Sequence, residues 1–499
     1  MTSHAFPRLT PAEAAALIHD GQTIAFGGFT SAGTPQAIAA AIGARAVQEH
    51  AAGRPFGIGN IGVATGAMDA SLAEATTFRT PYQCDPRLRA RINSGACDFV
   101  DMHISHLTQA VRYGFLGRLD RAIVQAAELS PDGKLLLTSA VGGAPTYCAS
   151  AEKVLVELNR SHPSSLFGMH DIYEPADPPH RRELRIFAVS DRIGSPVIQL
   201  DPAKIAGVVE SEVPDKGPTF KEPGSATRRI GQHVAEFLAR EVAIGRLPAA
   251  FLPIQSGVGD VGNGVLGAMG SHPDVPPFEM YTEVAQDAVV KLMEEERVRF
   301  VSCSALTLSP PGLRHLYDNL PFFRTKILLR PQEITNHPEV LRRLGVISIN
   351  TALEADIFGN INSTHVLGRY MMNGIGGSGD FTRNAYLSIF TCPSVVKESS
   401  ISTIVPMITH VDHSEHSVHV IATEWGVADL RRLSPPKRAA RIIDCCAHPD
   451  YREELHAYLR LAETGHTAHT VKAAFSFHER FQRTGDMRPQ APVAPSGTP

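Results

Sequence analysis

Glu283 is the residue whose type and setting first suggest covalent chemistry. It closes the segment Tyr281-Thr-Glu283, which follows the loop Pro276-Pro-Phe-Glu-Met280. Apolar residues at helical spacing predict a helix over residues 282–295, which places Glu283 at its start. Exposed N–H groups and the helix dipole stabilise a carboxylate there as an anion. Such an anion can attack an acyl group as a nucleophile, although most first-turn glutamates only cap a helix.

Two glycine-rich segments are candidate ligand loops. Gln255-Ser-Gly-Val-Gly-Asp-Val-Gly-Asn263 follows a predicted strand and opens a helix, so its backbone N–H groups could face a phosphate or an oxyanion. It matches neither a P-loop nor a dinucleotide fingerprint, and a plain tight turn is an equal interpretation. Asn373-Gly-Ile-Gly-Gly-Ser-Gly-Asp380 carries four glycines in eight residues. Because each glycine costs up to about 1 kcal/mol in a regular element, this segment favours a ligand-facing loop, with a structural turn as the alternative.

Histidines recur every third residue in one polar segment, at His410, His413, His416 and His419. This spacing fits neither the period of a strand nor one face of a helix with i and i+4 ligands. We therefore interpret the segment as a polar loop and predict no metal site.

Glu424 and the single tryptophan, Trp425, follow directly after a predicted strand over residues 418–422. Loops after strand C-termini commonly hold the sites of α/β proteins. Glu424 is therefore a candidate for binding or proton handling, with helix capping as the alternative.

Short apolar runs alternate with helical patterns along the whole chain, which predicts an α/β fold with mainly parallel sheets. A strand at Thr23–Phe26, a loop at Gly27–Gly33 and a helix at Pro35–Ala44 begin this pattern. The other predicted strands are residues 122–124, 205–209, 251–254, 299–302, 346–349 and 418–422. A further helix is predicted over residues 228–243.

Proline, glycine and charge dominate residues 212–224, which predicts an exposed connector between two parts. We expect one α/β domain over 1–222 and a second, carrying Glu283, over 223–480. Strand, glycine-rich loop and small-residue helix occur near the start of both parts, a weak indication of duplication. The proline-rich end, 484–499, is expected to be disordered.

Composition excludes several classes of protein. Of 499 residues, 43% are hydrophobic and 20% charged, and 47 Lys and Arg balance 51 Asp and Glu to a net charge of −4. This is globular composition without an electrostatic reason to bind nucleic acid or an anionic membrane. No apolar run approaches the roughly 18 residues of a membrane span, and no signal peptide is visible. Seven scattered cysteines indicate reduced thiols, so we expect a cytoplasmic protein.

Over about residues 20 to 460 the sequence resembles the acetyl-CoA hydrolase/transferase family of class I coenzyme A transferases, whose best-understood members are succinyl-CoA:acetate CoA-transferases. The resemblance rests on segments in one order: Gly27-Gly-Phe29, Val100-Asp-Met-His-Ile-Ser-His106, Ala127-Glu-Leu129, His170-Asp-Ile-Tyr-Glu-Pro175, Ser190-Asp-Arg-Ile-Gly194, Gln255-Ser-Gly-Val-Gly259, Tyr281-Thr-Glu-Val284, Arg330-Pro-Gln-Glu-Ile-Thr-Asn-His-Pro338, Gly359-Asn-Ile-Asn-Ser-Thr364, Met372-Asn-Gly-Ile-Gly-Gly-Ser-Gly-Asp-Phe381, Ile404–Met407, His410-Val-Asp-His413, Thr423-Glu424 and Cys446-Ala-His-Pro-Asp-Tyr451.

The resemblance implies two tandem CoA-transferase-like domains and a role for each matched residue. It makes Glu283 the nucleophile, which forms an acyl–glutamyl anhydride and then a glutamyl–CoA thioester. The amides of Val258 and Gly377 correspond to an oxyanion-stabilising pair, Asn336 to an acyl-site side chain and Glu424 to an auxiliary carboxylate. Positions that correspond to CoA contacts are Gly257, Val258, Gly259, Asp260, Val261, Asn373, Gly377 and Lys397.

The implied reaction is CoA transfer between succinyl-CoA and acetate by a ping-pong mechanism, with CoA as substrate and no permanently bound cofactor. An acetyl-CoA hydrolase, a propionyl-CoA:succinate CoA-transferase and a non-enzymatic acyl-CoA-binding protein are the alternatives. The family also implies a homodimer. Asp260 and Trp425 depart from the Asn and Gln usual in relatives, as do Gly262 and Gly264 from Ala, which bears on acyl specificity more than on reaction class.

Overall fold

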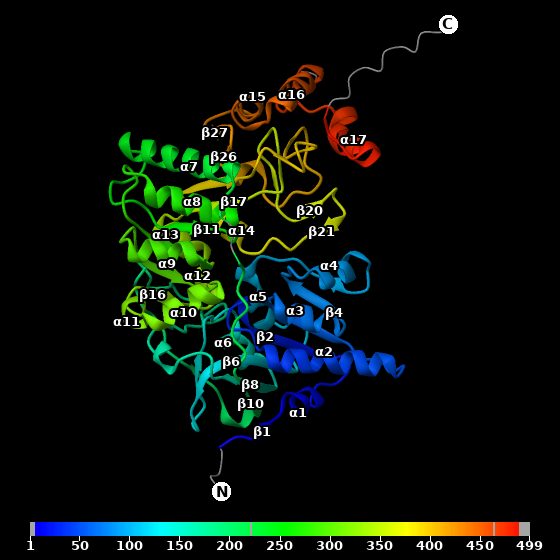
Figure 1. The fold of residues 1–499 in the computed structure, drawn as a ribbon, viewed down its shortest axis with the longest axis vertical. Coiled ribbons are helices and arrows are strands. Elements are labelled where there is room, and N and C mark those ends of the chain that lie inside the picture. Colours follow the sequence, from blue (N-terminus) through cyan, green and yellow to red (C-terminus); the bar gives the residue numbers. More distant parts are fainter. Residues whose placement is uncertain (1–4, 220–221, 463–464, 489–499) are drawn as a thin grey trace.

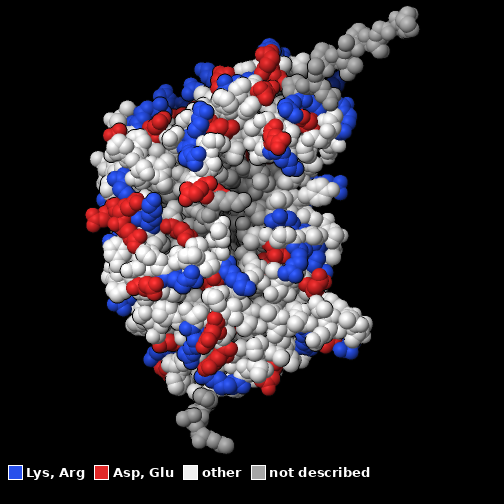
Figure 2. Space-filling model, in the orientation of Figure 1, with Lys and Arg blue, Asp and Glu red and all other residues white. Residues whose placement is uncertain are grey.

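The computed structural model describes residues 5–219, 222–462 and 465–488 (Figure 1). These residues form two halves, each built around one large β-sheet. The N-terminal half lies at one end of the long axis and the C-terminal half at the other, with α7 and α8 along one side of the latter (Figure 1). Side chains of both charge signs are interspersed on the face seen in Figure 2.

The N-terminal sheet is parallel along its main path. Its strands, in spatial order, are β1 (Arg8–Leu9), β10 (Ile205–Ser211), β8 (Lys153–Asn159), β6 (Arg121–Leu129), β2 (Thr23–Thr30), β3 (Ile58–Ala64), β4 (Thr76–Pro81) and β5 (Asp98–Phe99). Two antiparallel strands extend it beside β6, namely β7 (Lys134–Leu137) and β9 (Ile198–Gln199). The central strands are apolar on both faces, as expected where helices cover a parallel sheet.

The C-terminal sheet is also parallel, except at its last pair. Its order is β16 (Ile327–Leu329), β14 (Val298–Cys303), β12 (Phe278–Tyr281), β11 (Ile254–Ser256), β17 (Ile347–Thr351), β22 (Leu387–Thr391), β26 (Val420–Thr423) and the antiparallel β27 (Gly426–Asp429). Small sheets form from β13 (Val284–Ala285) with β15 (Ala305–Leu306), β19 (Ile361–Asn362) with β18 (Glu354–Asp356) and β25 (Ile404–Val405), β20 (His365–Val366) with β21 (Tyr370–Met371), and β23 (Val395–Val396) with β24 (Ile401–Ser402).

Helices connect the strands. The N-terminal half contains α1 (Pro11–Ala16), α2 (Gln36–Ala51), α3 (Ala67–Leu72), α4 (Pro86–Asn93), α5 (Ile104–Arg112) and α6 (Ala144–Ser150). The C-terminal half contains α7 (Ser225–Ala243), α8 (Asp260–Ser271), α9 (Asp287–Glu294), α10 (Pro310–Asp318), α11 (Leu320–Phe323), α12 (Gln332–Thr335), α13 (Pro338–Leu344), α14 (Ser378–Asn384), α15 (Pro435–Cys446), α16 (Pro449–Leu461) and α17 (Ser476–Thr484). The predicted α/β class with mainly parallel sheets is confirmed.

The two halves share one hydrophobic core. Buried side chains of both sheets, such as Val124 and Val301, belong to the same cluster. Backbone hydrogen bonds also cross: Val141 N donates to Ser304 O at 2.9 Å, and Leu306 N donates to Ser139 O at 2.8 Å. The two sheets fall on either side of residue 222, and the domain limits stay a prediction.

The connector predicted over residues 212–224 is exposed or half-buried at its described positions, apart from Asp215. Asp215 is 4% exposed and accepts hydrogen bonds from Gly33 N and Ser139 Oγ of the N-terminal half. Gly217 lies so close to Leu308 of the C-terminal half that a Cβ atom at residue 217 would lie 1.6 Å from the Leu308 carbonyl oxygen. The connector is therefore mostly exposed, as predicted, while Asp215 and Gly217 pack it against the junction of the two halves.

Two further local predictions differ from the structure. The strand predicted at Thr23–Phe26 continues to Thr30, through residues predicted to form a loop. Disorder is predicted for residues 484–499, of which 489–499 lie outside the described residues. Residues 484–488 are placed, since Thr484 ends α17 and Met487 is only 3% exposed.

Candidate active site

Glu283 lies at the carboxyl end of β12, in the middle of the C-terminal sheet. Its backbone oxygen accepts hydrogen bonds from Ser304 N at 2.8 Å and Ala305 N at 3.1 Å. The next two residues form β13, and α9 begins only at Asp287. The predicted helix start at Glu283 is therefore wrong: parallel pairing with β15 extends the chain, and the side chain projects from a strand end.

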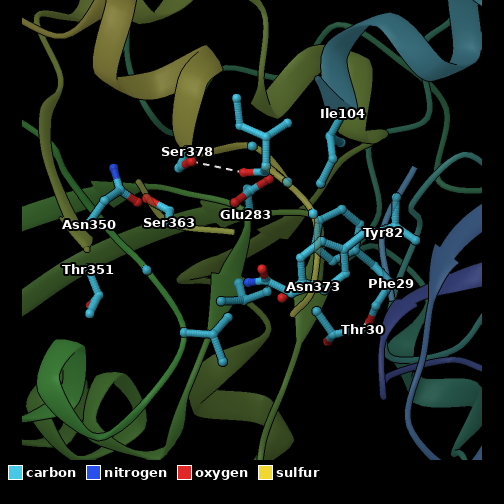
Figure 3. A pocket seen from close by; sticks show the side chains of 18 residues that line it. Phe29, Thr30, Tyr82, Ile104, Glu283, Asn350, Thr351, Ser363, Asn373 and Ser378 are labelled. Carbon is cyan, nitrogen blue, oxygen red and sulfur yellow. Dashed lines mark hydrogen bonds between the residues drawn. The ribbon is translucent and has the colours of Figure 1, made fainter. Parts of the chain in front are cut away.

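The side chain of Glu283 faces a cavity of about 180 Å³ between the two halves (Figure 3). The surface is hollowed where the halves meet (Figure 2). Strand carboxyl ends of both sheets converge here, as is usual for sites of parallel sheets. The lining residues are Phe29, Thr30, Val63, Tyr82, Ile104, Gly257, Val258, Glu283, Val284, Asn350, Thr351, Ser363, Asn373, Gly374, Ile375, Gly376, Gly377 and Ser378.

Burial raises the pKa of Glu283 to about 7, because the charged form loses solvation. Asn336 Nδ2 donates a hydrogen bond to Oε1 at 2.9 Å and opposes this rise in pKa, whereas the Asp380 carboxylate adds to it. The expected stabilisation of the anion by a helix dipole is thus replaced by the opposite effect. A poorly solvated carboxylate is a stronger nucleophile once it is deprotonated.

Gly377 closes over the carboxylate of Glu283. A Cβ atom at residue 377 would lie 1.9 Å from Glu283 Oε1 and 2.3 Å from Asn336 Nδ2. Its φ of −98° is open to any residue, so the requirement for glycine is one of space. The structure therefore brings the predicted residues Glu283, Asn336 and Gly377 into one contact group.

The first glycine-rich loop reaches the same cavity through Gly257 and Val258. Val258 is 49% exposed. Within the described part of the chain, neither the Val258 amide nor the Gly377 amide donates a hydrogen bond. Both N–H groups are thus available to an oxyanion or a ligand.

Gln286, which sequence reasoning missed, fixes the first glycine-rich loop. Its Nε2 donates to Gly257 O at 3.2 Å, and its Oε1 accepts from Gly259 N at 3.1 Å. The predicted positions Gly259, Asp260 and Val261 follow the lining residues, and Asp260 begins α8. Gly262 is required by space, since a Cβ there would lie 2.5 Å from Gly257 O.

The second glycine-rich loop contains Asn373 and Gly377 and is held by the N-terminal half. Gln83 N donates to Asn373 O at 3.2 Å, and both Asp101 carboxylate oxygens lie 3.0 Å from Ile375 N. Sequence reasoning missed these contacts, although Asp101 lies in a segment that carries the family resemblance.

Glu424 and Lys397 are not among the residues that line the cavity. Glu424 accepts hydrogen bonds from Ser394 N at 2.8 Å and Ser394 Oγ at 2.5 Å, and Trp425 Nε1 donates to the same hydroxyl at 3.1 Å. Lys397 is exposed at the turn between β23 and β24, where its Nζ lies 5.8 Å from the Phe481 ring centre. The structure thus leaves both residues apart from the Glu283 contact group.

The four spaced histidines point to different partners. His413 is buried, and its Nε2 lies 3.1 Å from Ser378 Oγ, whereas His419 Nδ1 accepts from Ser388 N. The His410 ring packs against His365 with centroids 3.9 Å apart. His416 is exposed, and no cluster of three or more metal-binding side chains occurs among the described residues.

Solved structures define the fold class. RipA from Yersinia pestis superposes with a TM-score of 0.69 at 22% identity, covering 90% of this chain and 96% of that chain. A 4-hydroxybutyrate CoA-transferase from Porphyromonas gingivalis superposes with a TM-score of 0.62 at 20% identity, covering 91% and 97%. The fold is therefore of the CoA-transferase type.

Sequence comparison then gives the family. The acetyl-CoA hydrolase/transferase N-terminal domain matches residues 2–210, and the C-terminal domain of the same family matches residues 312–459. The chain is 49% identical to a propanoyl-CoA:succinate CoA transferase of Escherichia coli, covering 96% of this chain and 98% of the relative. It is 42% identical to a succinyl-CoA:acetate CoA-transferase of Clostridium kluyveri (95% and 89%) and 38% identical to an acetyl-CoA hydrolase of Schizosaccharomyces pombe (96% and 95%). The chain belongs to the acetyl-CoA hydrolase/transferase family and is an enzyme, so the family resemblance is confirmed.

None of the described helices is long and apolar enough to cross a membrane.

Proposed function

We propose that this enzyme transfers coenzyme A between succinyl-CoA and a short monocarboxylic acid, acetate or propionate, through a glutamyl–CoA thioester at Glu283. One observation carries the proposal: a poorly solvated carboxylate faces a small cavity between two glycine-rich loops, with Asn336 as its hydrogen-bond donor. Among the lining residues Glu283 is the only one with a charged side chain, so no competing acid or base faces the substrate there.

The first half-reaction begins when a Glu283 oxygen bonds to the thioester carbonyl carbon. The C–S bond breaks, CoA leaves as a thiolate, and an acyl–glutamyl anhydride remains. The thiolate then attacks the glutamyl carbonyl carbon, which releases the free carboxylate and leaves a glutamyl–CoA thioester. A second carboxylate reverses these steps, so the thioester free energy passes from acid to acid.

Each step passes through a tetrahedral intermediate with a negative oxygen. We assign the amides of Val258 and Gly377 as its donors, since both line the cavity and neither donates within the described residues. Removal of one such donor typically costs about 10² to 10³ in rate. CoA is a substrate here. Gly257 to Val261, Asn373 and Lys397 are its proposed contacts, and Glu424 is a proposed auxiliary carboxylate.

The size of the cavity supports a short acyl group. Its volume of about 180 Å³ is below the roughly 300 Å³ at which pockets begin to enclose drug-sized ligands. Phe29, Val63, Tyr82 and Ile104 supply the apolar part of the wall from the N-terminal half. The E. coli and C. kluyveri relatives are named for exchanges between succinate and three-carbon or two-carbon acids.

Hydrolysis of acetyl-CoA is the second candidate, because several fungal relatives at 36–38% identity are named acetyl-CoA hydrolases. It uses the same nucleophile and differs only in whether water reaches the thioester.

Exchange kinetics separate the two functions. Purified enzyme is mixed with succinyl-CoA and acetate, propionate, butyrate or no acid, and new acyl-CoA and free thiol are measured. Transfer predicts new acyl-CoA without free thiol, with acetate or propionate preferred over butyrate. In a parallel assay with acetyl-CoA and no acid, release of free thiol at the rate of transfer would establish the hydrolase.

A further inference from the structure

Asn336 has a fixed amide orientation. Its Nδ2 donates both to Glu283 Oε1 at 2.9 Å and to Asp380 Oδ2 at 3.1 Å, while its Oδ1 accepts from Thr335 Oγ1 at 2.8 Å. Asn336 is fully buried, so these partners decide which end of the amide faces the nucleophile. If the amide turned over, its oxygen would face two carboxylates and its NH₂ group would face Thr335 Oγ1.

Asp380 does not line the cavity, and Asn336 links it to Glu283 by donating a hydrogen bond to each carboxylate. It is 5% exposed and is held from the other half of the chain. Ser105, at the start of α5, donates to it twice: the hydroxyl to Oδ1 at 2.6 Å and the backbone N–H to Oδ2 at 3.0 Å. One hydrogen-bonded path therefore runs from the N-terminal half through Asp380 and Asn336 to Glu283.

A second buried hydroxyl of α5 also binds a carboxylate of the C-terminal half, at the other end of α12 from Asn336. One turn further along α5, Thr108 Oγ1 donates at 2.9 Å to Glu333, a carboxylate that also pairs with Arg112 and Arg181. Thr108 and Ser105 are equally buried, at 1% and 2% exposed. Both hydroxyls bind a carboxylate of the C-terminal half, but only the carboxylate bound by Ser105 contacts Asn336.

We propose that Ser105 and Asp380 are positioning residues for the nucleophile: Ser105 fixes Asp380, and Asp380 fixes the Asn336 amide with its N–H groups toward Glu283. The inference rests on the proposed role of Glu283. According to this proposal, the position of Glu283 in the C-terminal half depends on Ser105 in the N-terminal half. The junction between the halves then supports catalysis although Ser105 and Asp380 do not touch the substrate.

The charge environment is consistent with this role. Asp380 faces Glu283 and His103, and its own carboxylate receives the two donors of Ser105 and one of Asn336. His103 lies directly beside the first turn of α14, since a Cβ on Gly379 would come within 2.3 Å of its Cε1 atom.

The test compares Ser105→Ala with Thr108→Val in the full-length enzyme. Each removes one hydroxyl from the same helix face and one hydrogen bond to a buried carboxylate. We expect Ser105→Ala to lower kcat by roughly tenfold to a hundredfold, the value of one hydrogen bond to a charged group, with the KM for acyl-CoA unchanged. Thr108→Val should shift the melting temperature to a similar extent and leave kcat within about twofold of wild type.

A double-mutant cycle with Asn336→Ala makes the test specific. If Ser105 acts through Asp380 on Asn336, then Ser105→Ala has no further effect on kcat once Asn336 is removed. Independent losses that multiply in the double variant would overturn the proposal, as would equal kcat values for Ser105→Ala and Thr108→Val. Failure of the proposed function is distinguishable, because Glu283→Ala would then retain activity whatever the Ser105 variants do.

Discussion

Glu283 Oε1 accepts a hydrogen bond of 2.9 Å from Asn336 Nδ2, and the backbone of Gly377 lies directly beside both atoms. The nucleophile, its donor and a candidate oxyanion amide thus come from three different connections of the C-terminal sheet. No two of them are close in sequence, so the site exists only once the parallel strands are in register.

Replacement of Glu283 should remove transfer while preserving the fold. Glu283→Ala and the isosteric Glu283→Gln both lack the carboxylate that forms the anhydride, so we expect kcat to fall at least about a thousandfold. Hydroxylamine or borohydride trapping after incubation with acyl-CoA alone should label the wild type at residue 283 and neither variant. Circular dichroism spectra that match wild type provide the folding control. A variant that transfers CoA at a rate near wild type would end the assignment of the nucleophile.

The order of substrate binding is a second prediction. A glutamyl–CoA thioester forms before the acceptor acid binds, so the kinetics should be ping-pong. Double-reciprocal plots of rate against acyl-CoA at several carboxylate concentrations should be parallel. Exchange of labelled succinate into succinyl-CoA should also occur without any second acid. Intersecting lines together with absent exchange would show that both substrates must be bound before chemistry.

The sequence predicts the fold class well because its signals are local. Apolar runs such as residues 205–209 and the amphipathic segment 228–243 form β10 and α7 within a few residues of the predicted bounds. The errors occur where tertiary contacts override local pattern. Glu283 lies between two strands and not in a helix because β13, which follows it, pairs with β15. These two strands are some twenty residues apart in the sequence.

Some residues of the candidate site are predictable from local sequence and others are not. Glycine clustering indicates both loops, because close approach to Glu283 leaves no room for a side chain at Gly377. Asn336 and Lys397 are predicted from the family resemblance alone. Ser105 and Asp101 were not found as site residues, since nothing in their local sequence reveals that they hold a loop more than 250 residues away.

The pH dependence of the first half-reaction should report the raised pKa of Glu283. The attacking form is the carboxylate, so kcat/KM should rise about tenfold per pH unit in the acid range and level off above the pKa of about 7. An unperturbed glutamate would give this plateau already above about pH 5.

Asp380→Asn tests the electrostatic part of that pH profile. The Asp380 charge raises the pKa of Glu283, so its neutralisation should move the acid limb to lower pH. The asparagine can keep an acceptor toward Asn336 and a donor toward Ser105 Oγ, so the plateau should remain measurable. An acid limb that stays in place would show that Asp380 carries no charge in the free enzyme.

Gly377→Ala should inactivate the enzyme by steric conflict. The added Cβ would lie 1.9 Å from Glu283 Oε1, so either the carboxylate or the loop must move. A displacement of this size from the productive geometry costs about 10²-fold or more in kcat/KM. Gly267→Ala is the matched control, because its Cβ meets no atom within 4 Å on the exposed side of α8. We expect the control to keep full activity and to gain up to about 1 kcal/mol in free energy of unfolding.

Removal of metal ions should leave the enzyme unchanged despite the four spaced histidines. His413 is buried against Ser378, His419 is bonded to Ser388, and His410 packs on His365, so three of these rings are committed to separate partners. A structural zinc would contribute on the order of 10 kcal/mol to folding, so its loss would be obvious in the melting temperature. We therefore expect extended dialysis against a strong chelator to change neither kcat nor the melting temperature. If activity fell and only Zn²⁺ restored it, His410, His413 and His416 would have to be reinterpreted as ligands, and the reaction as metal-assisted hydrolysis.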